Sequence, residues 1–454
     1  MMSRKNLKFL TAAGAMLLPG FALAAGSASV AGSAMKVIAV NPGANTGLNN
    51  IFVVFDTQNC QLQFNTQDAK AKVYRFGNMG AAYAEEVTDA RREGNVLTVD
   101  LKSDDSGFLL EENGSYSYYC WVVNYSNHRM TLEGVTAPAD EQDCDYSVLM
   151  IDGNAAAITY YTINGQPQTL SREIHIEYTT QVFDKESNYF ADQTENKTLE
   201  SMGSRVSLSP PAYCPTYFTV SGDRFLREWG MELEAETDMV QPVAVNSYTD
   251  AVQEDTSGEE GSNIMGGSSN GLGGSAPANI TFYAYTTDGV VHYEWQMARE
   301  QEFTNPDYRF YQQDLDYTFD EEGTFYLRFI GSNAEGTCET VGDVFTVTIG
   351  ASALEVPNAF SPNGDGVNDI WKVSYRSLVD FHCEIFNRSG QRIYGFDDPS
   401  GGWDGTWHGK TVNPGVYYYV ITATGADGQK YKKSGDINII KSVNYSPGTS
   451  TPEE

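Results

Sequence analysis

The feature of this sequence that most constrains its fold is a succession of short strand-like runs separated by turn residues. Segments such as Asn50–Asp56, Ala71–Phe76 and Ser115–Val123 are rich in apolar and aromatic residues, and Gly, Asn and Asp separate them. Glu173–Tyr178 alternates polar and apolar residues, which is typical of a strand buried on one face. This spacing is that of antiparallel sandwiches. We therefore predict an all-β fold built from serial antiparallel β-sandwich domains.

The first residues of the chain have the features of an export signal. A basic segment precedes an apolar run from Phe9 to Leu23, and Ala22-Leu23-Ala24 provides a small-x-small cleavage site. The run is too short for a membrane-spanning helix, and Pro19 interrupts it. We predict a cleaved signal peptide over residues 1–24. No later apolar segment approaches spanning length, so we predict no transmembrane anchor.

Turn clusters and a change in composition divide the remaining chain into segments. We predict an Ig-like sandwich over residues 34–135, a second sandwich over 141–252 and a PKD-like or Ig-like domain over 278–350. Residues 253–277 are rich in Gly, Ser and Asn and almost lack apolar side chains. Because such a segment cannot offset its ordering entropy by burial, we predict a flexible linker there.

Aromatic residues support the Ig-like interpretation of the first domain. Tyr118 stands two residues before Cys120, as in the tyrosine corner of immunoglobulin folds, and Tyr74 is a candidate for the core aromatic of the third strand. Trp295, in the third domain, lies within an alternating pattern, so we expect it to pack in a core and not to stack on a carbohydrate.

The chain contains six cysteines, and an exported chain can form disulfides in an oxidising compartment. Cys60 and Cys120 bracket the first domain, and Cys144 and Cys214 bracket the second. We predict the disulfides Cys60–Cys120 and Cys144–Cys214. Cys338 and Cys383 fall in different domains, which leaves open whether they pair across a boundary or are two buried thiols.

The chain is strongly acidic, with a formal net charge of −31. This charge excludes nucleic-acid binding, which needs a basic face to neutralise phosphates, and it disfavours adhesion to anionic lipid. A solvated acidic surface of this kind keeps a secreted protein soluble.

Four blocks near the C-terminus carry the most specific signal. They are Val356–Trp371, which contains Ser361-Pro362-Asn363-Gly364-Asp365-Gly366, followed by Ile385–Gly390, Gly402–Gly405 and Pro414–Tyr419. Together they resemble the gliding-motility-associated C-terminal domain of secreted Bacteroidota proteins, over residues 354–441. Two departures from that family are Ser389, where a Trp is usual, and a polar tail over residues 442–454.

The resemblance implies a route more than an activity. In that family the domain is a β-sandwich that serves as the type B sorting signal of the type IX secretion system. The expected partners are the type IX translocon and a porin-like outer-membrane protein. The expected location, after export to the periplasm, is the outer cell surface or the medium.

The first of these blocks also contains oxygen ligands that suit calcium. Asn363, Asp365, Asn368 and Asp369 lie within a short span, so we predict a calcium site as an option. The bidentate Glu that completes an EF-hand loop is missing. The alternative is a turn whose carboxylates accept hydrogen bonds from local backbone amides.

We predict no catalytic residues. Gly267–Gly271 matches the pattern Gly-x-Ser-x-Gly, but it lies in the predicted linker, without the strand and helix that a nucleophile elbow requires. The five histidines are scattered, without metal-ligand spacing.

The leading functional hypothesis is a surface or extracellular binding protein, an adhesin or matrix component, whose two N-terminal domains bind an extracellular glycan or protein. One alternative is a carbohydrate-active or proteolytic enzyme with a site built from loops of those domains. Another is a structural stalk or fibre subunit. A concave pocket with two convergent carboxylates would favour the enzyme, and a flat β surface would favour binding.

Overall fold

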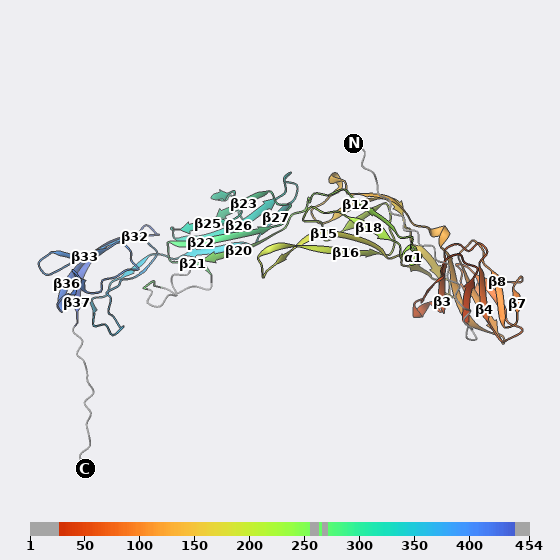
Figure 1. Cartoon of the computed structure of the whole chain (residues 1–454). Coiled ribbons are helices and arrows are strands. Elements are labelled where there is room, and N and C mark those ends of the chain that lie inside the picture. The colour runs from red at the N-terminus through yellow and green to blue at the C-terminus, as the bar shows by residue number, and fades with distance from the viewer. Residues whose placement is uncertain (1–26, 255–262, 266–270, 441–454) are drawn as a thin grey trace, which may run out of the picture. The chain divides into compact units, whose positions relative to one another are not determined.

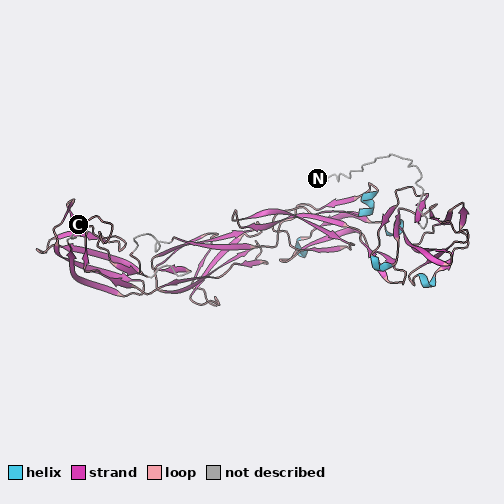
Figure 2. Cartoon of the chain, turned by 90° about the horizontal axis from the view of Figure 1, so that it is seen from below, coloured by secondary structure: helices cyan, strands magenta, loops and turns pink. Residues whose placement is uncertain are grey.

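The computed structural model describes residues 27–254, 263–265 and 271–440 (Figures 1 and 2). Nearly all of its regular structure is strand, as Figure 2 shows in magenta, which confirms the all-β prediction. It forms two compact units: residues up to 182 with 191–244, and residues 183–190 with those from 245 onward. The predicted signal peptide, the tail 442–454 and most of the Gly267–Gly271 motif lie outside the described residues.

The first domain is a sandwich of two sheets. One sheet has the order β1 (Ser27–Ala31), β4 (Gln61–Asn65), β8 (Val96–Asp100) and β7 (Arg91–Glu93). The other has the order β2 (Ile38–Val40), β3 (Asn50–Val54), β10 (Ser115–Asn124), β9 (Ser106–Glu112), β5 (Lys72–Phe76) and β6 (Glu85–Glu86). Leu62, Phe64 and Cys120 belong to the core of this domain. The domain starts earlier than the predicted residue 34, because β1 pairs along its whole length with β4.

The six-stranded sheet is buried on both faces over much of its area. Val54 and Val122 belong to the core of the first domain, whereas Val53, Trp121 and Val123 belong to a core that continues into the second domain. The sequence allows this because β3 and β10 contain near-continuous apolar runs, typical of strands covered on both sides.

The second domain contains three sheets. They are β11 (Thr131–Thr136), β12 (Ser147–Asn154) and β17 (Arg205–Leu208); β13 (Ile158–Tyr161) and β14 (Pro167–Leu170); and β16 (Tyr189–Leu199), β15 (Ile174–Asp184), β18 (Thr219–Gly222) and β19 (Leu233–Glu236). Gly165, at the turn between β13 and β14, has φ +77°. A Cβ there would lie 2.8 Å from the backbone of Met79 in the first domain, so only glycine fits.

Helical structure among the described residues is short. The α-helix α1 spans Arg224–Glu228, and the Asp223 carboxylate caps it by accepting a hydrogen bond from the Leu226 amide. The 3-10 turns are Ala44–Thr46, Ala81–Tyr83, Tyr125–His128 and Ala139–Glu141.

The third domain pairs two further sheets around Trp295, which is fully buried, as expected. One sheet has the order β20 (Ser247–Gln253), β22 (Ala278–Thr286) and β25 (Leu315–Phe319). The other has the order β21 (Leu272–Gly274), β28 (Phe345–Ile349), β26 (Gly323–Ser332), β23 (His292–Ala298) and β24 (Tyr308–Phe310), and β27 (Glu339–Val341) pairs with β26.

Two predicted boundaries near the third domain are wrong. β20 pairs with β22 over its whole length, so residues 247–253 belong to this domain and not to the second. Within the predicted linker 253–277, Leu272–Gly274 forms a parallel ladder with β28, and Gln253 bonds Gly273. Composition misled the prediction because backbone pairing needs no apolar side chain. A Cβ on Gly273 would in fact lie 2.3 Å from the Thr348 carbonyl oxygen.

The fourth domain has one larger sheet and two small ones. The larger sheet has the order β30 (Ala359–Phe360), β37 (Lys430–Ile439), β36 (Gly415–Gly425), β32 (Leu378–Phe386) and β33 (Arg392–Phe396). The small sheets are β29 (Ala353–Glu355) with β31 (Ser374–Arg376), and β34 (Thr406–Trp407) with β35 (Lys410–Thr411).

The predicted disulfides are wrong in this structure. Cys60 and Cys120 are buried thiols, and the Cys60 thiol donates to the Asp56 carbonyl at 3.2 Å. Cys214 and Cys383 are buried thiols as well, which contradicts Cys144–Cys214 and a Cys338–Cys383 pair. Bracketing a domain in sequence does not bring two Cβ atoms to the separation and orientation that a disulfide requires.

Candidate functional site

A buried ion pair lies where the first two domains meet. Arg172 donates from Nε to Asp223 Oδ2 at 2.8 Å, and the two side chains are 1% and 0% exposed. The other guanidinium nitrogens donate to the backbone carbonyls of Ala156 and His128, at 2.9 and 2.7 Å. The Tyr125 hydroxyl lies 3.2 Å from both Asp223 oxygens. Every charge in this cluster therefore has a partner.

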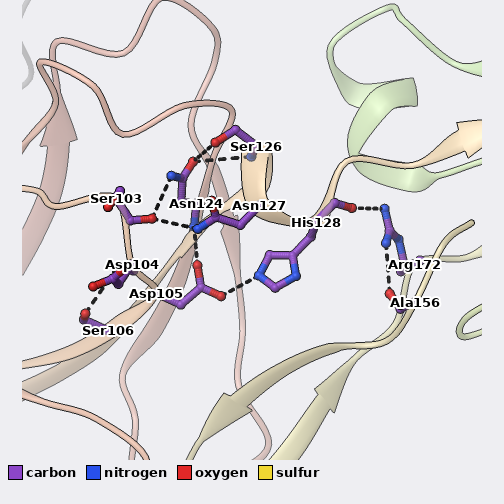
Figure 3. Close-up of polar contacts among 10 residues, drawn as sticks. All are labelled: Ser103, Asp104, Asp105, Ser106, Asn124, Ser126, Asn127, His128, Ala156 and Arg172. Carbon is purple, nitrogen blue, oxygen red and sulfur yellow. Dashed lines mark hydrogen bonds and ion pairs between the residues drawn. The ribbon is translucent and has the colours of Figure 1, made fainter.

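A second polar network adjoins the first through His128, as Figure 3 shows. His128 Nε2 lies 2.6 Å from Asp105 Oδ2, and the other Asp105 oxygen accepts from the Asn124 amide at 2.9 Å. The Asn124 and Asn127 side-chain amides both donate to the Ser103 carbonyl. These contacts hold the loop Ser103–Asp105 of the first domain against the end of β10 and the 3-10 turn Tyr125–His128. We conclude that the His128–Asp105 pair has a structural role, because it stabilises the arrangement of these two backbone segments.

A cluster of tyrosines and charged residues lies on the six-stranded sheet of the first domain. This tyrosine patch consists of Lys72, Tyr74, Glu86, Glu111, Tyr116 and Tyr119. The registers of β5 with β9 and β6, and of β9 with β10, place all six on one sheet face. It is the same face that farther along the strands carries Leu109 and Trp121 into the shared core.

The three tyrosine rings of the patch contact one another edge to face. Tyr74 and Tyr116 have ring centroids 5.8 Å apart at 80°, and Tyr116 and Tyr119 have centroids 6.3 Å apart at 68°. Tyr116 is 51% exposed, and the other two are half-buried. This geometry holds the rings in place while leaving apolar ring surface in water.

Hydrogen bonds fix the polar groups around these rings. The Tyr74 hydroxyl donates to Glu111 Oε2 at 2.6 Å, which raises the pKa of Tyr74 to about 12, with desolvation as a smaller cause. Lys72 Nζ lies 2.8 Å from Glu86 Oε2, and that contact raises the Lys72 pKa. The patch therefore holds the Tyr74 phenol and the Lys72 ammonium at fixed positions beside Glu111 and Glu86.

Sequence reasoning missed this patch because it took Tyr74 for a core aromatic. Trp121, which is 2% exposed, is the large aromatic of that sheet that lies in a core. Tyr118 is 7% exposed and donates to Asn50 Oδ1 at 2.6 Å. The density of tyrosine in Ser115–Tyr119, just before an apolar run, is the signal that could have indicated an aromatic surface.

The predicted calcium ligands form a closed turn. Asp369 Oδ1 accepts from the Asn363 and Gly364 amides at 2.8 and 2.7 Å, and Oδ2 accepts from Gly366 at 2.7 Å. These bonds lower the Asp369 pKa. Asp365 accepts from Val367 and from the Asn363 side chain. Asn368 has φ +53°, and its carbonyl accepts from Ser361. The geometry is that of the amide-capped turn, and calcium binding here stays a prediction.

Metal-binding groups and pockets provide no stronger candidate site in the described residues. Among residues 27–254, 263–265 and 271–440, no three His, Cys, Asp or Glu side chains form a group that could hold a metal ion. A depression of about 190 Å³ in the second domain contains one carboxylate, that of Asp143, among neighbours that include Gln142, Ser147 and Pro242.

The fourth domain brings its four sequence blocks around one core. Trp371 and Trp403, both fully buried, bond each other's backbone, and their rings contact Tyr419 and Tyr417 of β36. The block Ile385–Gly390 is the end of β32 and a turn in which Asn387 Oδ1 accepts from the Ser389 amide. Ser389 therefore stands in an exposed turn, and its polar side chain fits that position.

Two family models match parts of the chain. Residues 354–439 match the CHU_C type IX secretion signal domain. Residues 136–237 match the fibronectin type III domain, which corresponds to the second sandwich. The first match confirms the resemblance noted from the sequence blocks. Neither family is an enzyme family.

Solved structures show only a general likeness to this chain. A tetra-tandem repeat from the extending region of a large adhesion protein has 9% identity and a TM-score of 0.21, covering 85% of this chain and 96% of that one. The chicken CNTN1 FN1–FN3 domains have 7% identity and a TM-score of 0.22, covering 68% and 97%. A bacterial ice-binding adhesin has 10% identity and a TM-score of 0.21, covering 68% and 98%. No curated protein matches.

The fold and the matches define the class of protein. It is a multidomain β-sandwich protein with a sorting domain of the Bacteroidota type, preceded by a fibronectin type III domain. The type IX secretion signal directs it to the cell surface or the medium, through contact with the secretion machinery. In the part of the chain that the structure describes, no helix has the length and apolarity to cross a membrane.

Proposed function

We propose that this protein is a surface or extracellular binding protein, an adhesin or matrix component, and that its N-terminal domains hold the ligand site. The tyrosine patch is the observation that carries the proposal. Exposed aromatic rings with a polar rim are unusual on a solvated sheet and mark interaction sites. Tyrosine suits this role because it offers a large rigid contact area at low entropic cost.

The chemistry of the patch favours a neutral glycan as the ligand. A sugar ring presents apolar C–H groups that pack on aromatic faces, and its hydroxyls can donate to Glu86 and Glu111 or accept from Lys72. The overall charge of −31 disfavours polyanionic glycans. A protein ligand is the alternative outcome of the test below.

The enzyme alternative has less support. Glycoside hydrolysis needs two carboxylates on either side of the scissile bond, one of them free to act as a proton donor. In the patch, Glu86 pairs with Lys72 and Glu111 accepts from Tyr74, so both side chains already have partners within the patch. The patch lies on a sheet face, which favours binding.

Export by the proposed route uses the type IX translocon together with a porin-like outer-membrane protein. We infer contact with the translocon from the sorting domain. We infer the porin-like partner from the family resemblance alone. Neither partner contributes to ligand binding in this proposal.

An array of glycans and host-matrix proteins probed with the full mature chain tests the ligand proposal. We expect binding to one or a few neutral glycans and at least tenfold weaker binding by Tyr116→Ser, equivalent to about 1.4 kcal/mol. The matched control is Tyr308→Ser, because Tyr308 is 54% exposed but lies on β24 of the third domain. Binding only to proteins would replace the glycan proposal. No binding, or equal loss in both variants, would favour a structural stalk.

A further inference from the structure

Strand β36 of the sorting domain is apolar on both of its faces. Its residues Val416 to Ile421 read Val-Tyr-Tyr-Tyr-Val-Ile, without the polar alternation expected of a strand with one solvated face. Tyr417, Tyr419 and Ile421 face the domain core, where Tyr417 contacts Trp403 at 5.3 Å between ring centroids. Packing in the domain core therefore accounts for the apolar character of only every second residue in this run.

The intervening residues of β36 point into solvent. Val416, Tyr418 and Val420 are 43%, 45% and 38% exposed. Their spacing of two residues places them in line over roughly 13 Å of strand. In register with Tyr418 on β32 lies the half-buried Phe386. We call Val416, Tyr418, Val420 and Phe386 the apolar stripe.

Polar and charged residues border the stripe on both sides. On β37 the residues opposite the stripe are Asn438, Asp436 and Ser434, with Lys432 next along the same face. On β32 the residue opposite Val420 is Glu384, which pairs with Arg392 of β33 at 3.2 Å. An apolar centre within a rim of mixed charge is the usual anatomy of a protein interface.

We propose that the apolar stripe is the surface through which the type IX secretion machinery recognises this domain, and that its occupant is a protein of that machinery. The inference rests on the sorting role of residues 354–439, which requires such a contact. A rim with both signs of charge suits a protein partner. An anionic lipid surface suits it less, since the chain is strongly acidic.

The decisive variant is Tyr418→Ser/Val420→Thr in the full chain, expressed in a bacterium that has a type IX system. Both side chains point away from the core, so the domain should fold. We expect the surface-displayed fraction to fall at least tenfold and the protein to accumulate in the periplasm. The matched control is Val379→Thr, because Val379 is 44% exposed on β32 outside the stripe. It should be displayed normally.

Two further measurements keep the result unambiguous. The purified double variant should keep the melting temperature and the ligand binding of the native chain. A photo-crosslinking residue at position 418, but not at 379, should join the chain to an outer-membrane component of the type IX machinery. Normal display of the double variant, while deletion of residues 354–454 blocks display, would overturn the stripe but leave the sorting role intact. A crosslink mainly to a second copy of the chain, or to lipid, would also overturn it.

Discussion

Arg172 and Asp223 form a fully buried ion pair whose remaining polar atoms bond Tyr125 and the carbonyls of Ala156 and His128. Taking two charges out of water is costly, and their attraction compensates only when both are present and fully bonded. The Arg172–Asp223 pair therefore fixes the arrangement of the residues where the first two domains meet. Little in the sequence marks it, because an Arg and an Asp 51 residues apart give no local pattern.

We expect Arg172→Ala to destabilise the N-terminal unit by about 3–5 kcal/mol, since it leaves Asp223 charged and buried without its partner. Calorimetry of the full chain measures this as a shift of one unfolding transition. Arg205→Ala is the control, because Arg205 pairs with Glu141 at the surface and should contribute less than about 1 kcal/mol. Equal shifts for the two variants would contradict the role of the pair.

Asp369 should stabilise the turn Asn363–Asp369 in a pH-dependent way. Three backbone amides lower its pKa, so the carboxylate stabilises the folded turn above the ordinary Asp pKa, and this stabilisation is lost as the pH falls through the lowered value. Asp369→Ala should lower the melting temperature of the C-terminal domain at pH 7 and have progressively less effect below about pH 4. A pH-independent difference in melting temperature would contradict this account.

Calcium titration tests the remaining prediction for the same turn. A rise in melting temperature that a chelator reverses and that Asp365→Asn abolishes would support a site formed by Asn363, Asp365, Asn368 and Asp369. An unchanged melting temperature would show that the turn relies on its own amides alone.

Cysteine reactivity should follow the observed bonding state. Burial raises the pKa of Cys120, and that of Cys383 to about 12, so native thiolate is scarce at pH 8. We expect Cys60, Cys120 and Cys383 to resist alkylation in the native protein and to react in denaturant without reductant. Peptide mapping by mass spectrometry distinguishes this pattern from the Cys60–Cys120 disulfide.

At the scale of elements, sequence patterns predicted strands well wherever side chains alternate. Within the alternating segment Glu173–Tyr178, the residues from Ile174 onward lie in β15. They failed where backbone alone makes the contact, as at Leu272–Gly274. Sequence patterns also do not show whether an apolar strand is packed on one face or on both. β10 is buried on both faces along Trp121–Val123, whereas β36 is buried on only one face. That distinction needs the neighbouring elements.

The two faces of β36 should differ in their effect on stability. Ile421 is fully buried, and Ile421→Ala should cost about 2–5 kcal/mol through a cavity in the domain core. Val420→Ala, one residue earlier on the exposed face, should cost less than about 1 kcal/mol. Thermal unfolding of the full chain compares them. A similar cost at both positions would mean that the outer face of β36 is also packed.

At the scale of the whole molecule, the sequence predicted the all-β class of the fold and the sorting domain. The four sequence blocks identify the sorting domain because few other residues can replace its glycine turns and its buried tryptophans, such as Trp371 and Trp403. The proposed ligand site could not be predicted from the sequence. The tyrosine patch depends on where the second domain stops covering the first, and no local pattern records that limit.

The most direct test of the account is surface labelling of cells that express the full chain or a chain lacking residues 354–454. We predict that the full chain is labelled on intact cells and that the truncated chain is found in the periplasm. The truncated chain, once purified, should still bind the ligand of the N-terminal domains. Normal surface labelling of the truncated chain would contradict the sorting role, and with it the central claim that residues 354–439 are what directs this protein out of the cell.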